Sequence, residues 1–306
     1  MKKRHHTVPK CYLRNFTDAD GFLWVLDAKD RIFNTKPENV LVENNFYRLT
    51  LKNGDKSLYV EDTLAGIEGD YAAIYENKMS KDLFLTDEER VVVAVFIASL
   101  YLRTAPHRAS MRGMFESLRG SMQEWKKQFQ TLPAERRIAA ATPSRGDGIT
   151  IGDLDKYLEN YDEEHSVDVL KHLPHVAQLV FNMKWSIWKN DGRNFVTSDD
   201  PLVLMRPAAI KKYGPNAIGS VAGFMHKDVD LTLPLSSSRL LLAGWILEQD
   251  SYVTVDDEMA RKMNYRTITR SSERVIANAK EKVEAIRDTY TETKYKKTGK
   301  AAQSNA

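Results

Sequence analysis

The feature that most constrains the fold is an apolar run of about twelve residues, Val91 to Leu102, that follows a helix start signal. Thr86 and Glu89 have the spacing of a capping box, in which each side chain accepts a hydrogen bond from the other residue's backbone N–H. The run is apolar on nearly all sides, which predicts a helix at the centre of the fold. A membrane span needs roughly 20 apolar residues. Because this run is shorter and Ser99 interrupts it, we expect no membrane partner.

Length and composition are typical of one large intracellular domain. The chain has 306 residues, and its 45 Lys+Arg and 42 Asp+Glu leave a net charge of +3, which neither requires nor excludes a nucleic-acid partner. Cys11 is the only cysteine, so no intrachain disulfide is expected, and no secretory signal is evident after Met1. We therefore expect a cytoplasmic protein with one domain over residues 1–290, a polar helical insertion near 120–165 and a disordered basic tail over 291–306.

Periodicity predicts an α+β fold with a small N-terminal β unit, a central helical bundle, a second antiparallel sheet and closing C-terminal helices. The N-terminal unit is a predicted hairpin that continues into further short strands, and a helix runs from Glu61 to about Lys78. A second helix, near 167–183, is expected to be interrupted at Pro174. The predicted strands cover 22–26, 31–33, 44–47, 58–60, 185–188, 195–197, 202–205, 229–235 and 240–246, and the closing helices cover 259–267 and 275–286.

The first candidate site residues are a histidine and a glutamate. His6 follows His5 in an extended segment, so their side chains point to opposite sides and at most one faces a given pocket. An imidazole exchanges protons near neutral pH, which makes His6 a candidate general base or metal ligand. The alternative is an exposed basic N-terminus. Glu68 borders an apolar helical face, and it is either a solvated flank or, if a basic group such as Arg103 faces it, a buried salt-bridge partner or a catalytic acid or base.

Basic residues gather where the central helix ends at Pro106. Arg103, His107 and Arg108 either cap the negative end of the helix dipole or form an anion-binding cluster, because guanidinium groups grip phosphate and carboxylate in a bidentate way. From residue 103 to 145 there are nine Lys/Arg and three acidic residues, whereas 153–168 holds seven acidic residues and one lysine. Two oppositely charged surfaces are therefore predicted.

A polar turn, Thr197-Ser198-Asp199-Asp200-Pro201, follows a predicted strand. It is compatible with an ordinary turn, but a carboxylate at a strand end is also where scaffolds present catalytic or metal-binding groups. Asp199 is therefore the acidic residue that we would test first. The sequence contains no glycine-rich phosphate loop, His-Glu-x-x-His helix or Gly-x-Ser-x-Gly elbow, which removes most support for the standard nucleotide-binding and hydrolase classes.

Several motifs together resemble the family called domain of unknown function 4238. Its members begin with a similar His-x-Val-Pro-x-x-Tyr-Leu-x-x-Phe pattern, and this chain has Ser-Asp-Asp-Pro where the family usually has Ser-Asp-Asn-Pro, which adds the charge of Asp200. The resemblance covers residues 5 to 280, is weakest across 120–165, and implies no established activity. The matching stretches are 5–16, 45–47, the helix from Glu61 to Glu68, Arg90, 102–108, 197–201 and 233–236.

These observations favour a phosphodiester hydrolase, nuclease-like, of bacterial or phage origin with a defence or toxin role. Asp199 and Glu68 would hold Mg²⁺ or Mn²⁺, His6 would activate water, and Arg103, Arg108 and His107 would bind the substrate. An acid–base site without metal is equally compatible. The alternative is a non-enzymatic interaction protein that binds a host protein or nucleic acid, with the polar residues forming a structural network. A third interpretation is a transferase that acts on a nucleotide-type cosubstrate.

Overall fold

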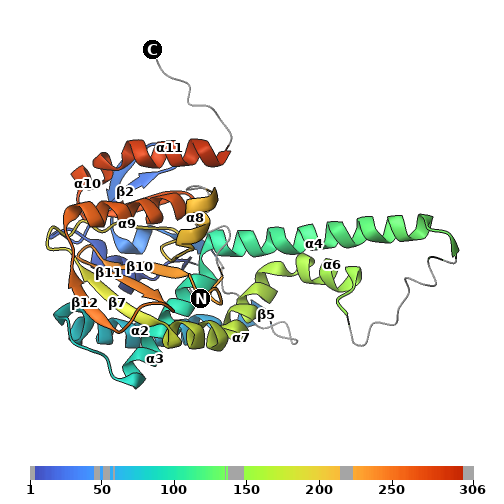
Figure 1. Cartoon of the computed structure of the whole chain (residues 1–306), viewed down its shortest axis with the longest axis horizontal. Coiled ribbons are helices and arrows are strands. Elements are labelled where there is room, and N and C mark those ends of the chain that lie inside the picture. Colours follow the sequence, from blue (N-terminus) through green and yellow to red (C-terminus); the bar gives the residue numbers. More distant parts are fainter. Residues whose placement is uncertain are drawn as a thin grey trace, which may run out of the picture.

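The computed structural model describes residues 4–44, 49–50, 56–57, 59–134, 136, 148–213 and 223–298 and has an α+β fold, as predicted. A central layer of strands lies between two groups of helices (Figure 1). One group contains α2 (Tyr59–Asn77), α3 (Asp87–Arg103) and α7 (Tyr161–Asn182). The other contains α9 (Asp257–Arg270) and α11 (Arg287–Thr298). No helix among the described residues combines the length and apolar character that a membrane crossing requires.

The larger sheet has five strands in the order β12-β7-β11-β10-β9. Its neighbours are antiparallel except β12 and β7, which are parallel, so the expected fully antiparallel sheet needs this correction. The strand β11 ends beside the start of β7, and β12 begins at that same end of the sheet, so β12 runs parallel to β7. The sequence pattern did not indicate this. The strands are β7 (Lys184–Lys189), β9 (Val203–Met205), β10 (Asp230–Ser236), β11 (Arg239–Gly244) and β12 (Ser251–Thr254).

Helices cover both faces of the larger sheet. Phe96 and Ile97 of α3 belong to the same buried cluster as Leu233, whereas Met263 of α9 belongs to the cluster that contains Leu240. Because successive side chains of a strand point to opposite faces, a strand covered on both faces is apolar at nearly every position. The prediction of a core helix over Val91–Leu102 is confirmed, and α3 begins with the predicted Thr86–Glu89 capping box.

The smaller sheet has the order β3-β2-β13-β8 and corrects two predictions. The N-terminal hairpin, β2 (Leu23–Asp27) and β3 (Ile32–Thr35), pairs as predicted, but it is not a separate unit, because β13 (Arg274–Ala277) joins it to β8 (Thr197–Ser198). Residues 275–277 were therefore wrongly predicted as helix. The helix α10 (Lys280–Ala285) follows the strand. The β-branched pair Val275 and Ile276 fits a strand buried between two others.

Three further differences concern element boundaries. Tyr59 and Val60 begin α2 instead of ending a strand, and α7 continues through Pro174 without interruption. The predicted disordered tail from 291 is helical as far as Thr298, because α11 packs against α9 and buries Tyr290 and Thr293; residues 299–306 lie outside the described residues. So do the predicted strand residues 45–47.

Short elements complete the description. The strand β1 (Arg4–His6) pairs antiparallel with β4 (Val42–Asn44), and β5 (Leu49–Thr50) pairs with β6 (Lys56–Ser57). The remaining short helices are α1 (Lys10–Leu13), α8 (Pro207–Tyr213) and three 3-10 turns at Arg14–Phe16, Pro37–Asn39 and Met79–Lys81.

A helical arm projects from this body (Figure 1). It consists of α4 (Ala105–Thr131) and the shorter α6 (Ile151–Glu159), which packs beside it. The central helix ends at Arg103, as expected near Pro106, and Pro106 lies in the first turn of α4, where its missing N–H costs no helical hydrogen bond. Thr104 caps the new helix. The arm includes residues 120–131 and 151–159 of the predicted polar insertion near 120–165.

Candidate functional site

The N-terminal strand places its two histidines in different surroundings, as the alternation of a strand predicts. The His5 Nε2 lies 3.2 Å from a carboxylate oxygen of Glu61, and His5 is 4 % exposed. The His6 Nε2 lies 3.1 Å from the carbonyl oxygen of Pro37. Burial lowers the pKa of His6 below its ordinary value, an effect that the nearby Glu68 charge opposes and the Arg103 charge reinforces. His6 is therefore neutral at physiological pH and electrostatically coupled to both residues.

The predicted pairing of Glu68 with Arg103 is present. An Arg103 guanidinium nitrogen lies 2.8 Å from a Glu68 carboxylate oxygen, and the Arg103 side chain is 1 % exposed against 24 % for Glu68. Burial and the Glu68 charge raise the pKa of the neighbouring Cys11 thiol to about 12, so this thiol is not an activated nucleophile. His6, Cys11, Glu68 and Arg103 thus form one cluster, the N-terminal cluster.

Asp199 holds the end of β8 to the start of β13. Its carboxylate accepts hydrogen bonds from the backbone N–H groups of Ser272 at 3.0 Å, Glu273 at 2.8 Å and Arg274 at 3.4 Å. These contacts link residues more than seventy positions apart and leave Asp199 6 % exposed. The turn aspartate therefore has a structural role in addition to any chemical one.

The second aspartate of the turn, Asp200, is more deeply buried. One of its oxygens lies 2.6 Å from Nε of Arg270, and the other accepts a hydrogen bond from the Thr104 hydroxyl at 3.3 Å. Burial raises the pKa of Asp200 to about 6, against the opposing effect of Arg270. Asp200 therefore joins three elements: the turn after β8, the start of α4 and the end of α9.

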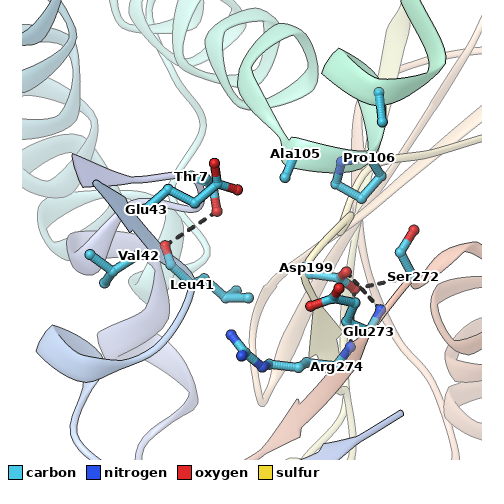
Figure 2. A pocket seen from close by; sticks show the side chains of 11 residues that line it. Thr7, Leu41, Val42, Glu43, Ala105, Pro106, Asp199, Ser272, Glu273 and Arg274 are labelled. Carbon is cyan, nitrogen blue, oxygen red and sulfur yellow. Dashed lines mark hydrogen bonds between the residues drawn. The ribbon is translucent and has the colours of Figure 1, made fainter. Parts of the chain in front are cut away.

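A cleft of about 370 Å³ lies beside Asp199 (Figure 2). One side is formed by the β1–β4 region, the opposite side by the β8 turn and the start of β13, and the top by the first turn of α4. Thr7, which follows His6 directly, lines this cleft together with Asp199, whereas His6, Glu68 and Arg103, which we expected to share one site with Asp199, do not line it. The lining residues are Thr7, Leu41, Val42, Glu43, Ala105, Pro106, Ala109, Asp199, Ser272, Glu273 and Arg274.

The cleft contains both carboxylates and a guanidinium. The half-exposed Glu43 lies 4.0 Å from Arg108, measured between a carboxylate oxygen and a guanidinium nitrogen. Partial burial and the charges of Glu273 and Asp162 raise the pKa of Glu43 above its ordinary value, whereas Arg108 acts in the opposite direction. The guanidinium of Arg274 extends from the Asp199 side into the space between the two walls (Figure 2). A carboxylate with a raised pKa in a cleft is a candidate general base.

The other predicted binding residues lie at the base of the arm. Arg108 pairs with Asp162 and approaches Glu43, so it borders the cleft. His107 packs against Tyr101, with 4.6 Å between ring centroids, and lies 6.5 Å from the His165 ring. Sequence reasoning missed Glu43 and Arg274, which belong to short strands without a recognisable motif. Within the described ranges no group of three or more His, Cys, Asp or Glu side chains is arranged to hold a metal ion.

The motifs behind the family resemblance meet at Tyr12. Its hydroxyl donates a 2.6 Å hydrogen bond to the carbonyl oxygen of Pro234 and lies 2.7 Å from the hydroxyl of Thr197. Asn15, in the same N-terminal segment, donates from its side chain to the carbonyl oxygen of Leu235 at 3.1 Å. The N-terminal motif, the 197–201 turn and the 233–236 segment are therefore joined by buried hydrogen bonds, which accounts physically for their occurrence together.

We expect the substitution Asp199→Ala to lower the free energy of unfolding by about 3 kcal/mol, because it leaves backbone donors of residues 272–274 without their acceptor. Asp199→Asn keeps one acceptor oxygen, so we expect it to lower the free energy of unfolding by only about 1 kcal/mol. Urea denaturation of both variants measures the effect, with the exposed Asp191→Ala as control. A change below about 0.5 kcal/mol for Asp199→Ala, the usual size for a surface substitution, would contradict the structural role.

One protein family matches the sequence, and its description is "Protein of unknown function (DUF4238)". The match covers residues 4–281, which include the N-terminal cluster, every residue that lines the cleft and the arm. No curated protein matches the chain, and no solved structure matches it either.

Proposed function

We propose that this chain, which belongs to the DUF4238 family, is a hydrolase that acts on phosphodiesters in the cleft beside Asp199. One observation carries the proposal: Glu43, with a raised pKa, shares the cleft with the guanidinium of Arg274. The cleft volume of about 370 Å³ suits one phosphodiester unit with part of its sugars.

The proposed reaction uses Glu43 as base and then as acid. Glu43 takes a proton from water, the resulting hydroxide forms a bond to phosphorus, and the bond from phosphorus to the leaving ester oxygen breaks. That oxygen then takes the proton from Glu43. Arg274, Arg108 and the N-terminal end of α4 balance the charge on the phosphoryl oxygens. Asp199 keeps the segment that carries Arg274 in place.

Two further parts of the proposal need separate tests: His6 as an alternative general base, and a bound metal ion. His6 is an alternative base, because it is neutral and next to Glu68. Glu68 and Asp199 were proposed to hold Mg²⁺ or Mn²⁺, but each already has a partner, in Arg103 and in the backbone of residues 272–274. A test therefore needs reactions with Mg²⁺, with Mn²⁺ and with a chelator.

The experiment measures hydrolysis of plasmid DNA, total RNA and bis(4-nitrophenyl) phosphate. We expect Glu43→Gln to lower the rate by about 10²-fold or more, the usual contribution of a general base, with unchanged thermal unfolding. Glu38→Gln, an exposed carboxylate on the same segment, is the matched control. His6→Gln tests the alternative base. Intact substrates under every metal condition would refute the hydrolase.

The second candidate is a non-enzymatic interaction protein in which these polar residues are structural. It is favoured by the internal partners of Asp199, Glu68 and His5, which include hydrogen bonds and ion pairs to groups of the chain itself. In that case the wild type, Glu43→Gln and His6→Gln all fail to hydrolyse the substrates, whereas Asp199→Ala and Glu68→Ala still destabilise the fold. Activity and unfolding measured on the same variants separate the two candidates.

A further inference from the structure

The arm helix α4 carries apolar side chains spaced alternately by four and three residues. This is the spacing of a coiled-coil seam, in which apolar residues face a partner helix over successive turns. No residue of α4 is buried, and Leu118 and Trp125 are 41 % and 61 % exposed. The seam residues are Met111, Phe115, Leu118, Met122, Trp125 and Phe129.

The chain itself covers the inner half of this seam with an acidic helix. Phe115 of α4 contacts Tyr157 of α6, with 4.7 Å between ring centroids, and Arg119 pairs with Asp155 at 3.4 Å. The helix α6 has nine residues, about 13 Å in length, whereas the 27 residues of α4 extend about 40 Å. The seam therefore continues well beyond the contact with α6.

One flank of the seam is lined by basic residues. Arg112, Arg119 and Lys126 each follow a seam residue by one position, so they lie along the same edge of the helix. Asp155 of α6 meets the middle one of these three cations. The intramolecular contact thus shows which kind of helix the surface accepts: an amphipathic one with acidic residues next to its apolar face.

We propose that the outer part of α4 binds an acidic amphipathic helix of a partner protein. We call this surface the distal seam and define it by Met122, Trp125, Lys126 and Phe129. A helix bound there continues the α4–α6 interface along the same seam and faces the same basic flank. The inference does not depend on the cleft, because it concerns the opposite end of α4.

The same charges argue against a second copy of the chain. In an antiparallel pair of α4 helices the basic flanks meet each other, and in a parallel pair each meets the neutral flank of Met114, Ser121 and Gln128, so neither arrangement supplies ion pairs. Nucleic acid is also less favoured. The Trp125 and Phe129 rings stack on each other, with centroids 5.1 Å apart and planes at 27°, which occupies faces that bases would need.

The test uses a synthetic acidic peptide of about three heptads, with leucine at the seam positions and glutamate at the flanks, and a counterpart with lysine at the flanks. Fluorescence polarisation of the labelled peptides reports binding to the full chain. We expect a dissociation constant on the order of 10 µM for the acidic peptide and at least about ten-fold weaker binding by Trp125→Ala. Lys126→Glu should weaken the binding of the acidic peptide and strengthen the binding of the lysine peptide.

Lys127→Glu is the matched control, because it makes the same charge change one residue away on the side of the helix opposite the seam. We expect it to alter binding less than two-fold. Equal effects of Lys126→Glu and Lys127→Glu would overturn the proposal, as would failure of the acidic peptide to bind at millimolar concentration. So would a wild-type dimer that Trp125→Ala makes monomeric, or a single-stranded oligonucleotide that displaces the peptide.

Discussion

Glu68→Ala is expected to lower the free energy of unfolding by about 3 kcal/mol, the lower end of the range for breaking a buried ion pair. The cost is large because Arg103 is 1 % exposed and keeps its charge where water cannot replace the lost carboxylate. Glu68 is 24 % exposed, which screens part of the interaction and keeps the effect from being larger. Chemical denaturation at neutral pH measures the change, with Glu76→Ala on the exposed face of α2 as control.

The two partners should not be equivalent. Arg103→Met removes the buried charge and leaves Glu68 with access to water, so it should cost less than Glu68→Ala, about 1–2 kcal/mol. The double variant Glu68→Ala/Arg103→Met should be more stable than Glu68→Ala alone, because it no longer contains the uncompensated cation. If the two single effects simply add in the double variant, the pair contributes no coupling and the ion pair is not what holds α2 to α3.

The same experiment bears on function, because Glu68 was predicted as a catalytic residue from sequence. If Glu68 is catalytic, removing its charge lowers the hydrolysis rate while the protein remains folded. If Glu68 is a structural partner, removing its charge lowers the stability of the protein first. Glu68→Gln, which keeps the shape and one acceptor oxygen, separates these effects. We expect it to remain folded at 25 °C, so any loss of hydrolysis in this variant is attributable to the charge.

Local signals in the sequence predicted several elements correctly. The Thr86–Glu89 capping box requires only residues three positions apart, and the apolar character of Val91–Leu102 indicates a helix buried on nearly all sides, which holds from Val93 onward. The N-terminal hairpin was likewise recognisable because its two strands are neighbours in the chain. Elements whose partners are close in sequence can be predicted from a short stretch of residues alone.

Elements defined by distant partners were not predictable in this way. Residues 274–277 form a strand only because β2 and β8, from widely separated parts of the chain, lie on either side. Glu43 belongs to the three-residue strand β4, and neither its neighbours nor its spacing indicates a cleft. The pairing of Glu68 with Arg103 was predictable because Glu68 borders the apolar face of one predicted helix and Arg103 stands at the end of the next, whereas the contacts of Asp199 with residues 272–274 depend on the strand that was missed.

Acid should destabilise the base of the arm through the histidine pair His107 and His165. Burial lowers the pKa of each from 6.5 to about 4, and for His107 the nearby His165 and Arg270 act in the same direction. For His165, Arg108 lowers the pKa, whereas Asp162 and Asp168 oppose it. Each histidine therefore binds its proton more weakly in the folded chain than in the unfolded chain.

The sign of the pH dependence follows from linkage. Above pH 6.5 both states are unprotonated at these positions and stability is unaffected; as the pH falls from 6.5 to about 4, the unfolded chain takes up protons that the folded chain does not. Stability is lost across this window, by about 3 kcal/mol for one such histidine. We expect His107→Phe, which keeps a ring against Tyr101, to remove part of this loss.

The measurement is the free energy of unfolding of wild type and variant from pH 7 to 4, because carboxylates with lowered pKa, such as Asp27, contribute acid sensitivity common to both proteins. As the pH falls through the window, the free energy of unfolding of the variant should rise relative to that of the wild type by about 3 kcal/mol. A constant difference between His107→Phe and wild type would mean that His107 titrates as it does in the unfolded chain, and that the contact between α4 and α7 is open to water.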